Sequence, residues 1–397
     1  MGKWTRRAFI GAGSLVGGGF VLGVGGLAFA PNRLTVKGQP NSEGGQLNTW
    51  IVIAPDNTIT VLVPHCEMGQ GTQTALTMMA AEEMNADWSR VRVKEAPALD
   101  AYANAYIIRA FIGDGIPAPL ARGFDYGTYR LASWFGTQMT GGSLSVRSTG
   151  HYGMRVAGAA AREMLVAAAA ARFNVKAAEC TSLNSRVMHS SGVEATFGEL
   201  AAEAAKMAVP AHPATKEPST YTIRRTPRPR FDIPSKVNGS AIYGIDFSVP
   251  GMKYAAIEIA PVSGGKLVSV DSAAAEHMPG VLKVVHLDEA VAVVADSYWQ
   301  ARKAAEALKP EWSDAGHGSV TTASIFSAFD RSLGAPPEMP KEAATVITAD
   351  YTVPFLAHAT MEPMVCTAKV DGDRCDVWAG VQDPLNARDA ASKALKM

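Results

Sequence analysis

The sequence lacks an excess of charge of either sign. Its 397 residues include 37 basic and 37 acidic side chains, so the formal net charge is zero. Domains that bind nucleic acid usually carry a basic excess, and this balance therefore predicts no nucleic-acid partner. Charged residues make up 19% of the chain and hydrophobic residues 47%, which is typical of folded domains rather than disordered ones. A chain of this length can form two or three domains with substantial cores.

Cysteine is also scarce. The four cysteines are scattered, and none belongs to a Cys-x-x-Cys pair. An iron–sulfur cluster or a structural zinc site within this chain is therefore not expected, and we assign no metal ligands. Cys366 and Cys375 flank a predicted hairpin turn, where a disulfide could form in an oxidising compartment. Buried thiols are the alternative that we favour, because free cysteine is usually buried.

The N-terminal segment has the pattern of an export signal. Residues Lys3–Ile10 are basic and include the adjacent arginines Arg6 and Arg7, and an uncharged run, Ala8–Ala30, follows. Small residues at its end suit a signal peptidase. We predict a twin-arginine signal over residues 1–30 and a periplasmic protein. A run of this length could also remain as a membrane anchor, although its eight glycines between positions 11 and 30 favour a signal peptide.

A glycine-rich turn, Glu67–Thr72, is the first candidate binding element. It lies between a predicted strand, Ile59–Val63, and a predicted helix, residues 74–84. Glycines at 69 and 71 let the backbone approach a ligand closely, and Gln70 offers both a donor and an acceptor. Amides that open a helix can bind an anion such as phosphate. An ordinary glycine-rich turn without a ligand is the alternative.

A second turn of small residues precedes another helix. Gly141, Gly142 and Ser143 lie in the stretch Thr140–Arg147, ahead of an alanine-rich helix predicted over residues 153–173. The two turns could face one shared ligand. Alternatively, Ser143 and Ser145 could serve only as helix caps.

The rest of the chain divides into three regions. Residues 209–235 are rich in proline and arginine and predict a linker. Residues 236–315 alternate strands, one of them at Ala241–Asp246, with two helices, which predicts an α+β domain. Residues 320–397 contain predicted strands at Thr345–Tyr351, Cys366–Val370 and Cys375–Ala379 and a helix from Leu385, and we interpret them as an incomplete domain. Residues 100–130 are predicted to be irregular, because glycine, proline and aromatic residues interrupt any pattern.

Four stretches, in this order, resemble one family. They are Glu67–Gly71, Gly141–Arg147, Lys236–Asp246, and His358–Pro363 continuing through Gln382. Together they are similar to the molybdopterin-binding large subunit of the xanthine dehydrogenase and aldehyde oxidase family, in the branch of isoquinoline 1-oxidoreductase beta subunits. The resemblance implies an α+β fold in which residues 31–208 form a molybdopterin-binding domain. Residues 236–315 would then be an α/β hammerhead domain, and residues 320–397 the start of a second molybdopterin-binding domain.

The resemblance also implies the cofactor, molybdopterin cytosine dinucleotide with molybdenum. Its expected contacts are Gly141, Gly142 and Ser143 in the second turn and, in the first, Met68, Gly69, Gln70 and Gly71. Gln382 matches a glutamine beside the molybdenum, although Val381 stands where the family often has threonine. His358 and Glu362 match a motif that we interpret as structural, because such side chains commonly brace turns.

The family's general-base glutamate and its Gly-Gly-Gly-Phe-Gly loop have no counterpart in this sequence, and family large subunits are much longer. The resemblance thus implies part of a molybdenum hydroxylase, inactive alone. The enzyme would oxidise a small N-heteroaromatic compound or aldehyde with water as oxygen source. Expected partners are a small subunit with two 2Fe-2S clusters and a separate chain that supplies the missing C-terminal half. The alternative is a non-catalytic truncated remnant. A solute-binding protein would need repeated βαβ units, and few are seen.

Overall fold

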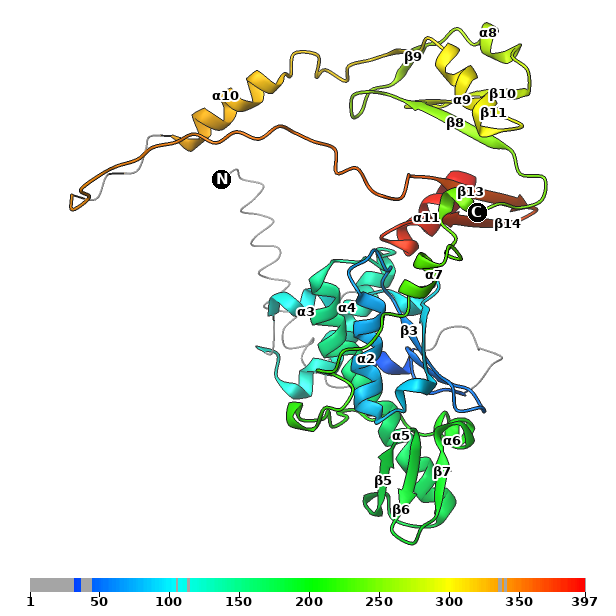
Figure 1. The fold of residues 1–397 in the computed structure, drawn as a ribbon, viewed down its shortest axis with the longest axis vertical. Helices are drawn as coiled ribbons and strands as arrows, with labels where there is room; N and C mark the ends of the chain where they lie inside the picture. The colour runs from blue at the N-terminus through cyan, green and yellow to red at the C-terminus, as the bar shows by residue number, and fades with distance from the viewer. Residues whose placement is uncertain are drawn as a thin grey trace, which may run out of the picture. The chain divides into compact units, whose positions relative to one another are not determined.

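The computed structural model describes residues 32–36, 45–104, 106–112, 115–334, 338 and 341–396. The predicted signal or anchor at residues 1–30 lies outside these ranges. The chain forms two compact units (Figure 1). The first comprises the chain up to Asp246 together with Glu362–Met397, and the second is Phe247–Met361. Within the described ranges, no helix combines the length and the apolar character needed to cross a membrane.

A four-stranded sheet forms the centre of the first unit. Its strands lie in sequence order: β1 (Gly45–Gln46), β2 (Ile51–Ile53), β3 (Ile59–Val63) and β4 (Val91–Glu95). The first three pair antiparallel, whereas β3 and β4 pair parallel through a crossover that contains α2 (Thr72–Met84). All three residues of β2 are buried, which explains its continuous run of Ile and Val. The strand at Ile59–Val63 and the helix after the first turn are thus confirmed.

Helix α2 packs against α5 (Arg155–Phe173), which a ten-residue π-helix, Ser145–Met154, precedes. Small residues let the two helices approach closely. A Cβ at Gly158 would lie only 2.3 Å from the carbonyl oxygen of Ala80. The alanine-rich pattern predicted this helix correctly, but the π-helix before it was not predicted.

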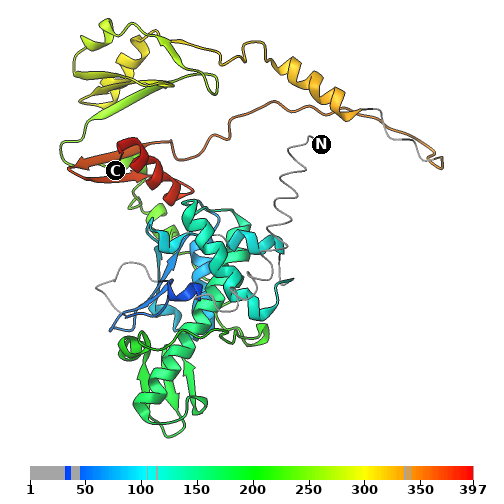
Figure 2. The same cartoon turned by 180° about the vertical axis from the view of Figure 1, so that it is seen from behind.

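Beyond α5, a small lobe contains β5 (Cys180–Leu183), β6 (Arg186–His189), β7 (Glu194–Thr196) and α6 (Phe197–Ala204). Figure 2 shows α5 running from beside α2 into this lobe. Thr196 and Glu199 form a capping box at the start of α6. This cap satisfies backbone N–H groups at the first turn of α6.

Residues 100–130, predicted to be irregular, contain two helices instead: α3 (Tyr106–Ile112) and α4 (Ala118–Trp134). Glycine in α4 lowers its intrinsic helix propensity. Tertiary packing compensates, because Tyr129 and Ala132 of α4 join a buried cluster with Ala103 and Leu385. Short 3-10 helices complete this unit at Arg33–Thr35, Trp88–Arg90, Asp100–Tyr102, Ala177–Glu179, Pro218–Thr220 and Gly244–Asp246. The predicted strand at Ala241–Asp246 is therefore wrong.

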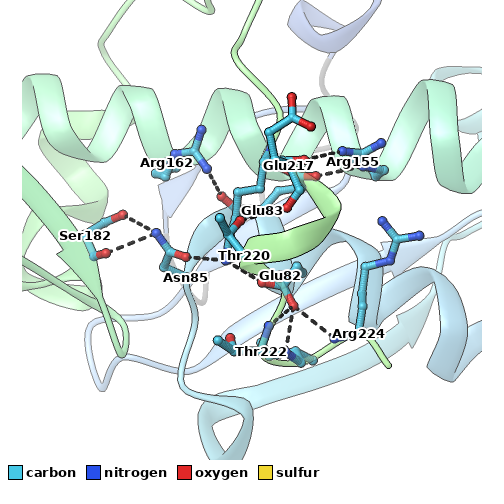
Figure 3. A network of polar contacts seen from close by, with 12 residues as sticks. Glu82, Glu83, Asn85, Arg155, Arg162, Ser182, Glu217, Thr220, Thr222 and Arg224 are labelled. Atoms are coloured by element: carbon cyan, nitrogen blue, oxygen red, sulfur yellow. Dashed lines mark hydrogen bonds and ion pairs between the residues drawn. The ribbon is translucent and has the colours of Figure 1, made fainter. Parts of the chain in front are cut away.

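The predicted linker, residues 209–235, is held against α2 by two buried carboxylates (Figure 3). One oxygen of Glu82 accepts hydrogen bonds from three successive backbone N–H groups, at 2.9 Å from Thr222, 2.6 Å from Ile223 and 2.9 Å from Arg224. The other oxygen pairs with Lys216. Glu83 pairs with Arg155 at 2.7 Å. The segment ends in a short helix, α7 (Ile233–Val237).

The C-terminal part of the first unit is a hairpin, β13 (Cys366–Asp371) and β14 (Arg374–Ala379), followed by α11 (Pro384–Leu395). The two predicted strands and the predicted helix are confirmed. In the hairpin register Cys366 faces Ala379 and Cys375 faces Val370, so the two thiols are not paired. Cys366 is exposed, and its predicted burial is wrong.

The second unit mixes strands and helices, as predicted. Its sheet has the order β10 (Val281–His286), β11 (Ala290–Ala295), β8 (Tyr254–Ile259), all antiparallel, and β9 (Leu267–Ser269) pairs separately with β12 (Glu311–Trp312). Helices α8 (Ala273–Glu276) and α9 (Tyr298–Ala307) contribute to its core. Helix α10 (Thr322–Leu333) follows. The strand predicted at Thr345–Tyr351 is not formed, because no described segment pairs with it. The hammerhead assignment and the predicted domain boundaries stay predictions.

Candidate functional site

Three segments that the sequence singled out meet at Thr140. The N–H of Cys66, just before the first glycine turn, donates to the Thr140 hydroxyl at 2.9 Å. The N–H of Thr140, just before the second turn, donates to the carbonyl oxygen of Gln382 at 2.9 Å. A third bond joins the N–H of Gln138 to the carboxylate of Asp383 at 2.8 Å. The structure therefore brings the two turns and Gln382 together, although long stretches of chain separate them.

The first turn is closed around its own carboxylate. Gly69 and Gly71 have positive φ angles of 97° and 78°, which glycine adopts without strain. One oxygen of Glu67 accepts from the N–H of Gly69 at 2.9 Å and of Gly71 at 2.8 Å, and the other accepts from Gln73 at 3.2 Å. The side chain of Glu67 is only 5% exposed. The amides that we expected to bind a ligand anion are thus engaged by a residue of the same turn.

Gln70 folds back on the turn as well. Its amide nitrogen donates to the carbonyl oxygen of Cys66 at 2.9 Å, and its amide oxygen accepts from the N–H of Met68 at 2.6 Å. Gln70 and Met68 both lie at the surface, and Met68 is 49% exposed. Gln70 therefore stiffens the turn while Met68 presents an apolar side chain to solvent.

Arg230 holds the first turn from outside. Its guanidinium donates to the carbonyl oxygen of Gly69 at 2.7 Å and lies 3.3 Å from the Glu67 carboxylate. It also binds both oxygens of Asp232, at 2.9 and 2.6 Å. These hydrogen bonds, together with Lys236 at 2.7 Å, hold the pKa of Asp232 far below its usual range. Arg230 lies in the segment that the sequence predicted to be a linker. The only local signal of an ion pair was an aspartate, Asp232, two residues later in the chain.

The second turn has free donors. The N–H of Gly141 donates to the Ser145 hydroxyl at 2.8 Å, so Ser145 braces the turn. Gly142, at a φ of 53°, and Ser143 are exposed, and their N–H groups have no acceptor among the residues that the structure describes. They open a helical stretch that continues through α5, where the helix dipole adds positive potential. This end of the site can bind an anion.

A buried polar cluster centres on His65, and no sequence pattern predicted it. His65 is 1% exposed, and its Nε2 lies 2.9 Å from the Thr149 hydroxyl of the π-helix and 2.7 Å from the Asn104 side-chain amide. Burial lowers the pKa of His65 to about 4, so the ring is neutral at pH 7. The cluster connects the segment between β3 and the first turn to the π-helix that follows the second turn. A histidine two residues after an apolar strand was the available signal.

The surroundings of Cys66 favour the protonated thiol. Its thiol lies 3.3 Å from the Glu95 carboxylate. Burial, and then the charge of Glu95, raise the pKa of Cys66 to about 12. Because the thiolate is the nucleophilic form, this raised pKa disfavours nucleophilic reactivity of Cys66 at neutral pH.

The remaining predicted residues are placed as follows. Gln382 is exposed and contacts Thr140 through its backbone. Glu362 accepts from the N–H of Gly244 at 3.0 Å, consistent with a bracing role. His358 is exposed in the second unit. The donor set therefore fits an anionic cofactor at Gly142 and Ser143 and not at the amides of Gly69 and Gly71.

Comparisons with known proteins relate this chain to molybdopterin-binding proteins. A family model described as a molybdopterin cofactor-binding domain matches residues 5–106, which include the first turn. The chain is 34% identical over 314 residues to the isoquinoline 1-oxidoreductase subunit beta of Brevundimonas diminuta, covering 70% of this chain and 36% of that protein. It is 30% identical over 371 residues to the membrane-bound aldehyde dehydrogenase [pyrroloquinoline-quinone] of Gluconacetobacter polyoxogenes, covering 84% and 42%.

A third relative is the aldehyde oxidoreductase molybdenum-binding subunit of Escherichia coli K12, 28% identical over 207 residues, with 43% of this chain and 28% of that protein covered. The chain thus spans less than half the length of these relatives.

Proposed function

The chain is homologous to the molybdopterin-binding subunits of oxidoreductases, and we propose that it supplies one portion of a molybdenum hydroxylase. The enzyme would oxidise a small N-heteroaromatic compound or an aldehyde, with water as the source of oxygen. The observation that carries the proposal is the junction at Thr140, where two glycine turns and Gln382 are hydrogen-bonded together.

The second turn is the part of the site suited to hold the cofactor, which we propose to be molybdopterin cytosine dinucleotide. The N–H groups of Gly142 and Ser143 and the hydroxyl of Ser143 are available donors for its phosphates. Backbone amides can hold such an anion without a net positive protein, which suits the zero net charge. The bound metal would supply the redox chemistry, while the chain orients it.

Among the described residues, the carboxylates near the junction are already engaged. That of Asp383 accepts from the N–H groups of Gln138 and Asn386. The carboxylate of Glu67 is occupied by three amides, and that of Glu95 is bonded to the Cys66 thiol. We therefore propose that the base lies outside the residues described, and that electrons leave through a small subunit with two 2Fe-2S clusters.

Molybdenum content of the complex tests the proposal. We would co-express the full chain with the adjacent reading frames and measure molybdenum by mass spectrometry and the nucleotide released by acid hydrolysis. The expected result is about one molybdenum per complex and release of cytidine monophosphate. A purified complex that contains neither would overturn the proposal and favour a non-catalytic remnant.

A matched pair of variants locates the binding turn. Ser143→Asp places a negative charge beside the free amides and is expected to reduce molybdenum content at least about tenfold, since close like charges repel. Ser143→Asn has similar size without the charge and should retain most of the metal. Equal loading of the two variants would show that the second turn does not contact the anion.

A further inference from the structure

The first glycine turn contains an anion of its own. Four donors converge on the Glu67 carboxylate: the N–H groups of Gly69, Gly71 and Gln73, and the guanidinium of Arg230. We propose that Glu67 is the permanent occupant of this turn and that Arg230 locks it in place. Both are positioning residues that fix the conformation of the first turn. A ligand anion would then bind at the second turn instead. Only this last consequence depends on the proposed function.

Burial argues that Glu67 is not a placeholder waiting for a ligand. Its side chain is 5% exposed, and charge-assisted hydrogen bonds to backbone amides are among the stronger ones in proteins. A ligand anion that displaced it would have to replace all of these bonds and leave the carboxylate unpaired, which is costly for a buried charge.

The glycines fit this role. A Cβ at Gly69 or Gly71 would meet nothing within 4 Å, so neither position is crowded in this structure. Both residues have positive φ angles, and this backbone path directs their two N–H groups to the same oxygen of Glu67. The glycine pattern therefore reflects the conformation needed to enclose Glu67.

We call the contacts of Arg230 with Gly69, Glu67 and Asp232 the clamp. Arginine suits this role because its guanidinium can donate to several acceptors at once. One nitrogen reaches the carbonyl of Gly69, another reaches Glu67 and Asp232, and Nε completes a two-point contact with Asp232. Lysine has a single ammonium and cannot reproduce this fork. Charges alternate along the series Glu67, Arg230, Asp232 and Lys236, so the negative charge of Glu67 is balanced.

The segment that carries Arg230 is seated on the helix that the turn opens. The N–H of Phe231 donates to the Thr74 hydroxyl at 3.1 Å, and the Phe231 ring lies 5.1 Å from the ring of Trp88. The clamp thus connects the predicted linker directly to the first turn.

Hydrogen exchange of the full-length chain, followed by mass spectrometry, tests the inference. In Glu67→Gln, the backbone amides of residues 66–73 should exchange hydrogen roughly tenfold faster or more. Glutamine has no negative charge, and one end of its side-chain amide is a donor that cannot accept from the backbone N–H groups. Glu194→Gln is the control, since Glu194 pairs with Arg186 at the exposed surface of the small lobe. That variant should leave exchange over residues 66–73 unchanged.

Arg230→Lys provides an independent variant should Glu67→Gln fail to fold. We expect faster exchange in residues 66–73 and also in residues 226–237. Wild-type exchange over residues 66–73 in a folded Glu67→Gln or Arg230→Lys protein would overturn the inference. So would increased molybdenum loading in Glu67→Gln, which would identify Glu67 as a competitor of the ligand. Loss of protection in a protein that binds no molybdenum would leave this inference standing and reject only the proposed function.

Discussion

The hydroxyl of Thr140 accepts the backbone N–H of Cys66 at 2.9 Å, while the N–H of Thr140 donates to Gln382. One residue therefore links both glycine turns to the C-terminal segment. Thr140 is only 5% exposed, so water does not readily replace its hydrogen bonds to the two segments.

Removing this hydroxyl should loosen the site. Thr140→Val keeps the shape of the side chain but leaves the Cys66 N–H without its acceptor, at an expected cost of about 1–3 kcal/mol in the free energy of unfolding. Thr140→Ser keeps the hydroxyl and should cost less. Urea unfolding of both variants measures the difference. Equal stability of the valine and serine variants would contradict the role of the hydrogen bond.

His65 should make the fold sensitive to mild acid. Its pKa is about 4 in the folded chain and about 6.5 when unfolded, so the unfolded state binds more protons between these values. The stabilising effect of keeping the ring neutral is complete above pH 6.5 and decreases as the pH falls toward 4. At full extent the difference corresponds to roughly 3 kcal/mol.

Unfolding of wild type and His65→Gln at pH 7.5 and pH 5 measures this effect. The variant should lose part of the pH dependence of the wild-type chain. His212→Gln, which changes an exposed histidine, should keep all of it. Identical pH dependence of His65→Gln and wild type would show that His65 titrates normally.

The contact between α2 and α5 should not tolerate a methyl group at Gly158. Gly158→Ala would place Cβ 2.3 Å from the carbonyl oxygen of Ala80, and the helices would have to separate. Overpacking of this kind typically costs about 1–3 kcal/mol. Gly127→Ala is the matched change in α4, where nothing lies within 4 Å of the new Cβ. It should stabilise the chain by up to about 1 kcal/mol, because alanine favours helix. Thermal unfolding that gives the two variants the same sign of effect would contradict this packing.

We propose periplasmic export from the paired arginines at positions 6 and 7. Replacing both with lysine preserves the charge but removes the twin-arginine pattern, and the chain should then remain in the cytoplasm. Fractionation of cells that express the two forms would measure this. Unchanged export of the lysine form would show that another route is used.

Local patterns in the sequence determined the elements on which the site is built. Alternating apolar residues at Ile59–Val63, glycines before α2, the alanine-rich stretch of α5 and the hairpin at residues 366–379 all predicted structure that the fold contains. These features depend on periodicity and backbone preference within a few residues, which a sequence displays directly.

Tertiary structure alone decided how these elements work together. No local pattern showed that Thr140 would join the two turns, that Glu67 would take the amides of its own turn, or that Arg230 of a proline-rich segment would hold it. Each of these outcomes depends on which donors and acceptors the fold brings within about 3 Å, across separations of a few to more than two hundred residues. Hydrogen bonds between distant residues leave no periodic signature, and so the sequence placed the turns while the fold decided which amides remain available to a ligand.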